Sequence, residues 1–294
     1  MSLFGDFAVF ADAQLRSTDV DPTYPVLRDI ARDHDPDTGL WLTFLHVAYY
    51  HIGSALKAFD AFTRGDPLDD ALLRLPCGTE RRAHRDPRKL QRHLQSLAAI
   101  ADQHGTLDAW LRRAVVDDPR RSWRRIQDLL RQPWGNGRWA AYKTGEMLTK
   151  VNDLPLAPTD MGHQNGSGSR HGLALFYPKA PAGNRDRDIA YLDRLSDEIV
   201  ERLRLAGVAA TIETTETSLC DFHSLVCGRY YVGYDIDAML QQLDAVPSNL
   251  TQRALAARAK HIPVEYLGEY GGWRTVDKQR ARAYRDRQRL LLRQ

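Results

Sequence analysis

Residues 134–143 read Trp-Gly-Asn-Gly-Arg-Trp-Ala-Ala-Tyr-Lys, and residues 155–163 read Pro-Leu-Ala-Pro-Thr-Asp-Met-Gly-His. Gly135 and Gly137 permit the positive φ values of a tight turn, and the pattern that follows predicts a helix over 138–150. The bare N–H groups at the start of such a helix form an anion site, to which Arg138 adds a charge. Asp160 follows beyond the far end of the helix. The stretch therefore predicts an anion-binding turn and a nearby carboxylate.

The composition of the 294-residue chain is that of an ordinary globular protein, with 43% hydrophobic and 27% charged residues. It contains no run of about 18 apolar residues, and the N-terminus does not resemble a signal peptide. Three cysteines do not make a disulfide framework. We therefore expect a cytosolic protein without membrane association.

Arginine is clustered, although the net charge is only +3. Residues 81–92 carry five arginines and a lysine, residues 112–131 carry seven arginines, and the stretch from Arg274 is again rich in arginine. Clustered arginine can release counterions from a phosphate backbone. The alternative is that these residues are the solvated faces of helices.

Hydrophobic periodicity predicts a mostly helical chain. We expect a core helix over 40–62, a surface helix over 187–206 and one short strand over 208–213. The polar, glycine-rich segment 162–172 is predicted to be a loop between lobes. Further helices are predicted over 24–32, 88–103, 106–116, 119–131, 235–243, 248–260 and 275–292.

The turn, the helix and the acid together resemble the helix-hairpin-helix DNA glycosylase superfamily. Asp160 lies 23 residues beyond Gly137, within Pro158-Thr-Asp160. The resemblance implies a mainly α fold of the DNA glycosylase-like type, with its hairpin at about 126–150 and a small α+β C-terminal extension. The predicted division is an N-terminal segment over 1–38, a helical core over 39–185 and a C-terminal region over 186–294.

In this superfamily the hairpin binds the DNA backbone and the acid is catalytic. The predicted DNA contacts are Gly135, Asn136, Gly137, Arg138 and Lys143. For Asp160 the alternative is a cap for the next segment. Trp139 occupies the position of the Schiff-base lysine of bifunctional glycosylases, and the four-cysteine cluster of iron–sulfur members is absent. A lyase reaction is therefore not expected.

Two further segments narrow the resemblance. Residues 76–94 read Pro-Cys-Gly-Thr-Glu-Arg-Arg-Ala-His-Arg-Asp-Pro-Arg-Lys-Leu-Gln-Arg-His-Leu, and residues 220–237 read Cys-Asp-Phe-His-Ser-Leu-Val-Cys-Gly-Arg-Tyr-Tyr-Val-Gly-Tyr-Asp-Ile-Asp. Together with the hairpin and Thr159–His163, they resemble the phage amino acid:DNA transferases, relatives of the α-glutamyl/putrescinyl thymine pyrophosphorylases. The resemblance covers roughly residues 40–245.

That family implies a reaction on modified thymine in phage DNA. An amine displaces pyrophosphate from 5-pyrophosphoryloxymethyluracil, and the base stays on its sugar. The implied partners are double-stranded DNA carrying the modified uracil and a free amino acid such as glycine or serine, in the cytoplasm of an infected bacterial host. No cofactor is needed in principle, because the leaving group is already activated.

Candidate roles follow from that chemistry. Guanidinium groups bind phosphate oxyanions bidentately, which suits Arg81, Arg82 and Arg85 to the pyrophosphate. Salt bridges on a helix face are the alternative for these arginines. Asp160 would deprotonate or orient the amine, or stabilise positive charge at the methylene carbon, and His163 is a second candidate base. The base or amino acid pocket is predicted to contain Tyr49, Tyr50, Trp139, Gln164 and Asn165.

Other interpretations stay open at this point. The aromatic residues can belong to the core, and residues 162–172 can be a plain linker. A monofunctional DNA glycosylase and a DNA-binding module without chemistry are alternatives for the whole chain. The spacing of Cys220, His223 and Cys227 invites a zinc interpretation, but no metal site is predicted. Asp235 and Asp237 are expected to begin a helix.

Overall fold

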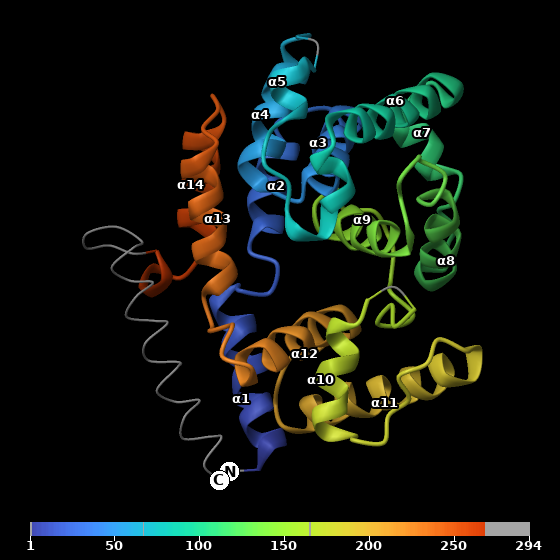
Figure 1. The fold of residues 1–294 in the computed structure, drawn as a ribbon, viewed down its shortest axis with the longest axis vertical. Helices are drawn as coiled ribbons and strands as arrows, with labels where there is room; N and C mark the ends of the chain where they lie inside the picture. The colour runs from blue at the N-terminus through green and yellow to red at the C-terminus, as the bar shows by residue number, and fades with distance from the viewer. Residues whose placement is uncertain (1, 67, 165, 268–294) are drawn as a thin grey trace. The chain divides into compact units, whose positions relative to one another are not determined.

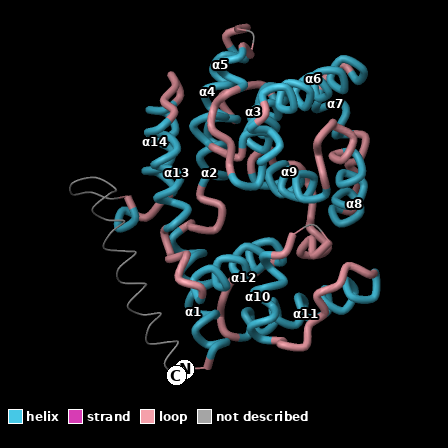
Figure 2. The backbone as a smooth tube through the Cα atoms, in the orientation of Figure 1, coloured by secondary structure: helices cyan, strands magenta, loops and turns pink. Residues whose placement is uncertain are grey.

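The computed structural model describes residues 2–66, 68–164 and 166–267, and within them it contains helices and loops but no strand (Figures 1 and 2). The mainly α prediction is confirmed. In chain order the helices are α1 (Leu3–Ser17), α2 (Thr23–Ala31), α3 (Pro36–Tyr49), α4 (Ile52–Thr63), α5 (Asp70–Leu73), η1 (Thr79–Arg85), α6 (Pro87–His104), α7 (Leu107–Arg112), α8 (Pro119–Leu129), α9 (Arg138–Lys150), α10 (Gly168–Phe176), α11 (Asp186–Leu205), α12 (Ile212–Val226), α13 (Tyr234–Ala245), α14 (Thr251–His261) and η2 (Val264–Tyr266).

The chain forms two compact units. Among the described residues, unit 1 consists of those within 2–22, 158–238 and 262–267, and unit 2 consists of those within 23–157 and 239–261. Unit 1 therefore contains α1, α10, α11, α12 and the first part of α13, whereas unit 2 contains α2 to α9, the rest of α13 and α14. The predicted domain boundaries 1–38, 39–185 and 186–294 remain predictions.

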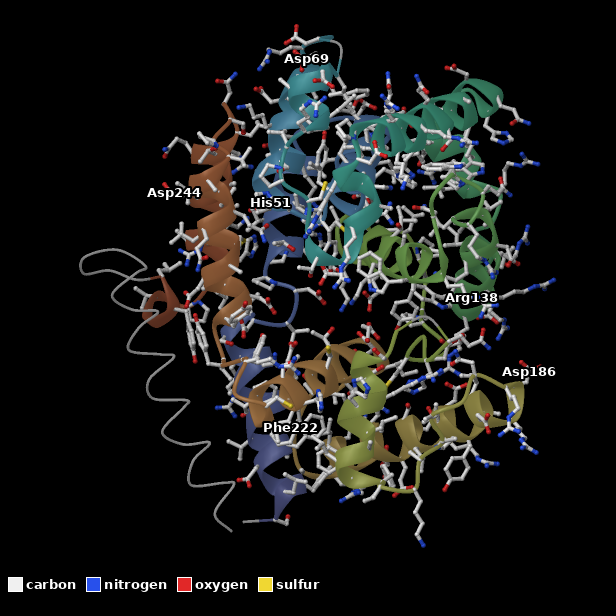
Figure 3. The ribbon with its side chains drawn as sticks, viewed as in Figure 1. His51, Asp69, Arg138, Asp186, Phe222 and Asp244 are labelled. Atoms are coloured by element: carbon white, nitrogen blue, oxygen red, sulfur yellow. The ribbon has the colours of Figure 1, made fainter. Side chains whose placement is uncertain are left out.

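The core of unit 1 is built on close contact between α10 and α12. A Cβ atom at Gly172 would lie 2.3 Å from the backbone oxygen of Leu219, and one at Gly168 would lie 2.4 Å from Cys220 Sγ. Phe222 of α12 (Figure 3) packs on Phe7 of α1, with ring centroids 5.2 Å apart. The prediction of a loop over 162–172 is thus wrong for its second half, because these glycines serve helix packing.

The core of unit 2 contains α3 and α4 rather than one helix over 40–62. Tyr50 adopts a left-handed conformation (φ +48°) that ends α3, and its N–H bonds to His46 O. His51 then caps α4, because its Nδ1 accepts from the N–H of Ser54 at 3.2 Å. The predicted single helix is wrong because an apolar period does not reveal a local reversal of the backbone.

The strand predicted over 208–213, and with it the α+β character of the C-terminal extension, is not found. Residues 208–211 are a short connection, and α12 begins at Ile212. Thr211 and Thr214 form a reciprocal capping box that starts the helix. Val208 and Ala210 are buried in the core of unit 1 without a neighbouring strand among the described residues.

The other predicted helices are confirmed in place, apart from that over 106–116, of which only Leu107–Arg112 is helical, and that over 275–292, which lies outside the described residues. Asp235 and Asp237 stand in the first turn of α13, as expected. None of the described helices combines the length and the apolar character that crossing a membrane requires.

Candidate functional site

The segment predicted to be the hairpin, at about 126–150, contains the end of α8, the turn 130–137 and α9, all in unit 2. Trp123 of α8 packs edge-on against Tyr142 of α9, with ring centroids 5.3 Å apart. Gly145 allows this approach, since a Cβ atom there would lie 2.8 Å from the Trp123 ring. The two helices therefore hold the turn between them in a fixed shape.

The two glycines of the turn have different reasons to be glycine. Gly135 has the positive φ, +79°, whereas Gly137 has φ −78° and is the N-cap of α9. The prediction of positive φ is wrong for Gly137. A Cβ atom on Gly137 would meet nothing within 4 Å, so this helix start is open, and Arg138 is exposed beside it (Figure 3). A helix N-terminus beside a cation favours anions in general, and phosphate binding here remains a prediction.

Asn136 and Lys143 are engaged within the protein. The buried Asn136 side chain donates from Nδ2 to Leu130 O at 3.0 Å, which braces the turn against the end of α8. Lys143 is buried in an ion pair with Glu146, 2.8 Å between Nζ and Oε2. DNA contact by either residue remains a prediction, and the structure gives each a structural role.

Arg81 is buried on η1, with only 6% of its surface exposed. No carboxylate among the described residues pairs with it, and its Nε has no hydrogen-bond partner there. Burial lowers the pKa of the guanidinium to about 10, while the Cys77 thiol nearby acts in the opposite direction. A buried cation without a counterion is costly unless an anion visits it.

Two histidines surround this guanidinium. His84 Nδ1 lies 2.7 Å from Ala48 O and His93 Nδ1 lies 2.7 Å from Trp134 O. Their rings are 4.8 Å apart. His84 also stands next to the turn, because a Cβ atom on Gly135 would lie 3.6 Å from His84 Nε2. Arg81, the histidine pair and the hairpin thus form one cluster within unit 2.

Arg82 and Arg85, the other two arginines predicted to bind pyrophosphate, are exposed on η1. Arg85 lies close enough to Cys77 to lower the pKa of its thiol, against the larger upward effect of burial. The sequence predicts the same role for all three arginines, but only Arg81 of the three is buried.

The aromatic residues predicted to form the pocket also differ in burial. Tyr50 and Trp139 meet edge-on with ring centroids 5.0 Å apart, and both are half-buried. A Cβ atom on Gly78, the residue before η1, would lie 2.4 Å from Tyr50 O. Tyr49 is a core residue instead, fully buried with its hydroxyl donating to Leu72 O at 2.9 Å. Tyr50 and Trp139 therefore remain the candidates for contact with a base.

Asp160 lies in unit 1, half-buried in the loop before α10. Its Oδ1 accepts from the N–H of Gly162 at 2.8 Å, and its Oδ2 accepts from Thr159 Oγ1 at 2.9 Å. It does not cap the next helix, since Ser167 is the N-cap of α10. The alternative of a helix cap is therefore wrong, although the carboxylate does order its own turn.

His163, three residues after Asp160, is buried, and its imidazole is neutral near neutral pH. The Ser196 hydroxyl donates to Leu192 O, so it accepts from His163 Nε2–H at 2.6 Å. Nδ1 is thus the unprotonated nitrogen, and it has no hydrogen-bond partner among the described residues. Burial, with Arg170 next, lowers the pKa of His163 to about 4. A neutral imidazole can accept a proton through this lone pair, and the lowered pKa makes His163 a weaker base than an ordinary histidine.

Asp193 of α11 is a neighbour of Asp160 that the sequence did not single out. Its Oδ1 is buried and has no partner among the described residues. Burial first, then the charges of Asp160 and Asp197, raises the pKa of Asp193 to about 6. A carboxyl group whose pKa is raised beside another carboxylate is a common feature of acid–base sites.

The remaining predicted residues add little. Gln164 is exposed, and Asn165 lies outside the described residues. Cys227 Sγ lies 3.7 Å from His223 Nε2, while Cys220 packs on Gly168. Within residues 2–66, 68–164 and 166–267, no three His, Cys, Asp or Glu side chains are placed to hold a metal ion together.

A family model described as amino acid:DNA transferase matches residues 71–231. The match contains η1, the histidine pair, the hairpin, Asp160 and Asp193. A search of curated proteins finds no match.

Proposed function

Because the chain belongs to the amino acid:DNA transferase family, we propose that it uses the amine of a free amino acid to displace pyrophosphate from 5-pyrophosphoryloxymethyluracil in DNA. The observation that carries the proposal is the buried guanidinium of Arg81, which has no carboxylate partner among the described residues. A glycosylase releases a neutral or singly charged base and has no polyanionic group to hold. A pyrophosphate-displacing transferase does.

The proposed reaction forms one bond and breaks one. The amine nitrogen bonds to the exocyclic methylene carbon, and the carbon–oxygen bond to pyrophosphate breaks with its electron pair on oxygen. Arg81 stabilises the charge that collects on the leaving group, with Arg82 and Arg85 as exposed contributors. In principle this displacement needs no cofactor, because the pyrophosphate ester is already activated.

Asp160 is the proposed base or orienting group for the amine, with His163 as the second candidate. Support comes from the fixed carboxylate of Asp160, held by the N–H of Gly162, and from the free Nδ1 lone pair of His163. An ammonium group must lose a proton before it can attack, and a carboxylate or neutral imidazole can accept it. Each residue can be tested alone.

DNA binding is proposed for the open start of α9, where Gly135, Gly137 and Arg138 would hold a backbone phosphate. Tyr50 and Trp139 are the proposed contacts to the modified base, by stacking. The substrates in this proposal are double-stranded DNA carrying the modified uracil and an amino acid such as glycine or serine. The setting would be the cytoplasm of a bacterium infected by a phage.

Mass spectrometry of nucleosides tests the reaction. DNA carrying 5-pyrophosphoryloxymethyluracil is incubated with the protein and a mixture of amino acids and is then digested. We expect a nucleoside that carries one amino acid in place of pyrophosphate. Free base or abasic sites would identify a glycosylase instead, and bound but unchanged DNA would identify a binding module.

The Asp160→Asn variant tests the catalytic assignment. The amide oxygen can still accept from the N–H of Gly162, so the turn should persist. We expect product formation to fall by roughly 10²–10⁴-fold, the usual contribution of a general base, while DNA affinity stays within about threefold of the parent, since the change leaves the hairpin and its Arg138 intact. The exposed Asp117→Asn is the control. Full product formation by Asp160→Asn would refute the assignment.

A further inference from the structure

Three buried basic side chains meet beside the hairpin, and two of them belong to histidines without an assigned role. Arg81, His84 and His93 are 6%, 2% and 1% exposed. Structural arginines at this depth normally pair with a carboxylate, and this one has no such partner among the described residues. The positive charge of Arg81 is therefore not balanced by a carboxylate among the described residues.

The hydrogen bonds fix the proton positions of both imidazoles. Backbone carbonyls only accept, so the Nδ1 atoms that face Ala48 O and Trp134 O must carry hydrogens. Arg81 Nη2 lies 2.9 Å from His84 Nε2 and 3.2 Å from His84 Nδ1, so the guanidinium lies against the imidazole ring. His93 Nε2 presents a lone pair, and no hydrogen bond reaches it from the part of the chain that the structure describes.

Two nitrogen atoms in the cluster therefore await a partner, Arg81 Nε and His93 Nε2. The guanidinium can donate at once. His93 Nε2 can donate only after it has taken up a proton. A phosphate-type anion carries several negatively charged oxygens, so a single such ligand offers acceptors for more than one donor of this kind.

We propose that Arg81, His84 and His93 form a buried site for a phosphate-type anion. In this proposal His93 takes up a proton from solvent when the anion binds and then donates that proton to the departing pyrophosphate. The inference rests on the proposed function for the identity of the anion. It adds the histidine pair, and a proton source for the leaving group, to that site.

The proposed proton transfer involves solvent, His93 and the bridging oxygen of the leaving group. The anion binds and His93 Nε2 takes a proton from solvent. When the carbon–oxygen bond breaks, the bridging oxygen keeps the electron pair and accepts the proton from His93 Nε2. The products at this site are neutral His93 and singly protonated pyrophosphate, while the proton of the attacking amine leaves separately.

The charges that surround His93 explain why the empty site is unprotonated. Burial, followed by the neighbouring His84 and then Arg81, lowers the pKa of His93 to about 3, and the bond to Trp134 O partly opposes this. Burial and Arg81 lower the pKa of His84 to about 4. The thiol of Cys77 is a further titratable group near Arg81, and the exposed Arg85 lies near that thiol. A multiply charged anion reverses the sign of this environment and favours the imidazolium.

Calorimetry with inorganic pyrophosphate and the full chain, without DNA or divalent cations, tests the site. We expect binding near neutral pH, with roughly one proton taken up by His93 per anion when the heats in buffers of different ionisation enthalpy are compared. Arg81→Met should weaken binding by about tenfold or more, the effect of losing a charge-assisted hydrogen bond. Arg74→Met, an exposed arginine that already pairs with Asp70, is the control and should bind as the parent does.

The His93→Asn variant separates proton uptake from folding. The Asn amide can still donate to Trp134 O, so the variant is expected to fold, and its melting temperature checks this. We expect it to bind pyrophosphate with about one proton less than the parent. Unchanged proton uptake would overturn the role of His93, and absence of pyrophosphate binding by the parent would overturn the site.

A titration with unmodified duplex distinguishes the two sources of such an anion. If Arg81→Met lost affinity for the duplex but not for pyrophosphate, the site would hold a backbone phosphate, and the leaving-group role would be wrong. Amino acid transfer in the nucleoside assay without Arg81-dependent pyrophosphate binding would leave the proposed function standing and the inference refuted. Arg81-dependent pyrophosphate binding without amino acid transfer would refute the proposed function and leave the anion site standing.

Discussion

At the scale of single residues, adjacent tyrosines have opposite roles. Tyr49 points into the core and bonds to Leu72 O, whereas Tyr50, in its left-handed conformation, meets Trp139. The Trp139→Ala variant removes one face of this pair. We expect its affinity for duplex DNA carrying the modified base to fall by about 1–3 kcal/mol, the usual contribution of one stacked base. Fluorescence anisotropy measures this.

The control for that prediction is Tyr49→Phe. It removes only the hydroxyl that donates to Leu72 O, and it should reduce the free energy of unfolding by about 1 kcal/mol without changing DNA affinity. If Tyr49→Phe weakened DNA binding as much as Trp139→Ala does, the effect would come from general loosening of unit 2, and the pocket would be wrongly placed.

At the scale of elements, the spacing Gly168–Gly172 decides how closely α10 approaches α12. The Gly172→Ala variant would place its Cβ 2.3 Å from Leu219 O, a backbone atom that cannot rotate away. We expect a loss of about 1–3 kcal/mol in the free energy of unfolding, as for other overpacked sites. Gly166→Ala, where a Cβ would meet nothing within 4 Å, is the control. Equal denaturation midpoints for the two variants would contradict the packing argument.

The elements also show which features the sequence could predict. The bounds of α9 follow from local signals, glycines before Arg138 and a helical period up to Lys150, and the structure has the same bounds. Glycines at 168 and 172 look like loop residues in sequence, because the reason for them is the surface of α12. His84 and His93 stayed unassigned because their partners, Ala48 O and Trp134 O, lie 36 and 41 residues away.

At the scale of the whole molecule, residues 2–22 belong to unit 1, and a group of buried and half-buried acids joins them to it. Asp19, next to α1, accepts from the N–H of Gly233 at 2.6 Å and from Tyr230 Oη at 2.8 Å. Tyr230 also bonds to Asp235 at 3.0 Å, and Gln14 donates to Asp221 at 2.8 Å. One phenol hydrogen cannot serve two carboxylates, so the group must retain a proton of its own.

The pKa values of Asp19, Asp221 and Asp235 are all raised. Burial, which exceeds the opposing bonds from Gly233 and Tyr230, raises the pKa of Asp19 to about 6. Burial and mutual repulsion raise the pKa of Asp221 and Asp235 well above the ordinary value of 3.8. Because these carboxyl groups bind more protons in the folded state than in the unfolded state, their contribution to stability falls as pH rises from about 4 through the raised pKa values.

The Asp235→Asn variant tests this sign. Its amide oxygen can still accept from Tyr230, but it carries no charge to be confined. At pH 8.5 we expect its melting temperature to exceed that of the parent by about 2–4 °C, the shift that on the order of 1 kcal/mol produces in a domain of this size. At pH 4 the difference should vanish, because the parent's carboxyl group is then protonated in the folded state. Histidines with lowered pKa values, such as His163, do not affect this comparison, because both proteins contain them.

The exposed Asp244→Asn on the same helix (Figure 3) is the control and should melt as the parent does at both pH values. A destabilised Asp235→Asn at pH 8.5 would mean that the ionised carboxylate is needed there, and the proton count for the group would be wrong.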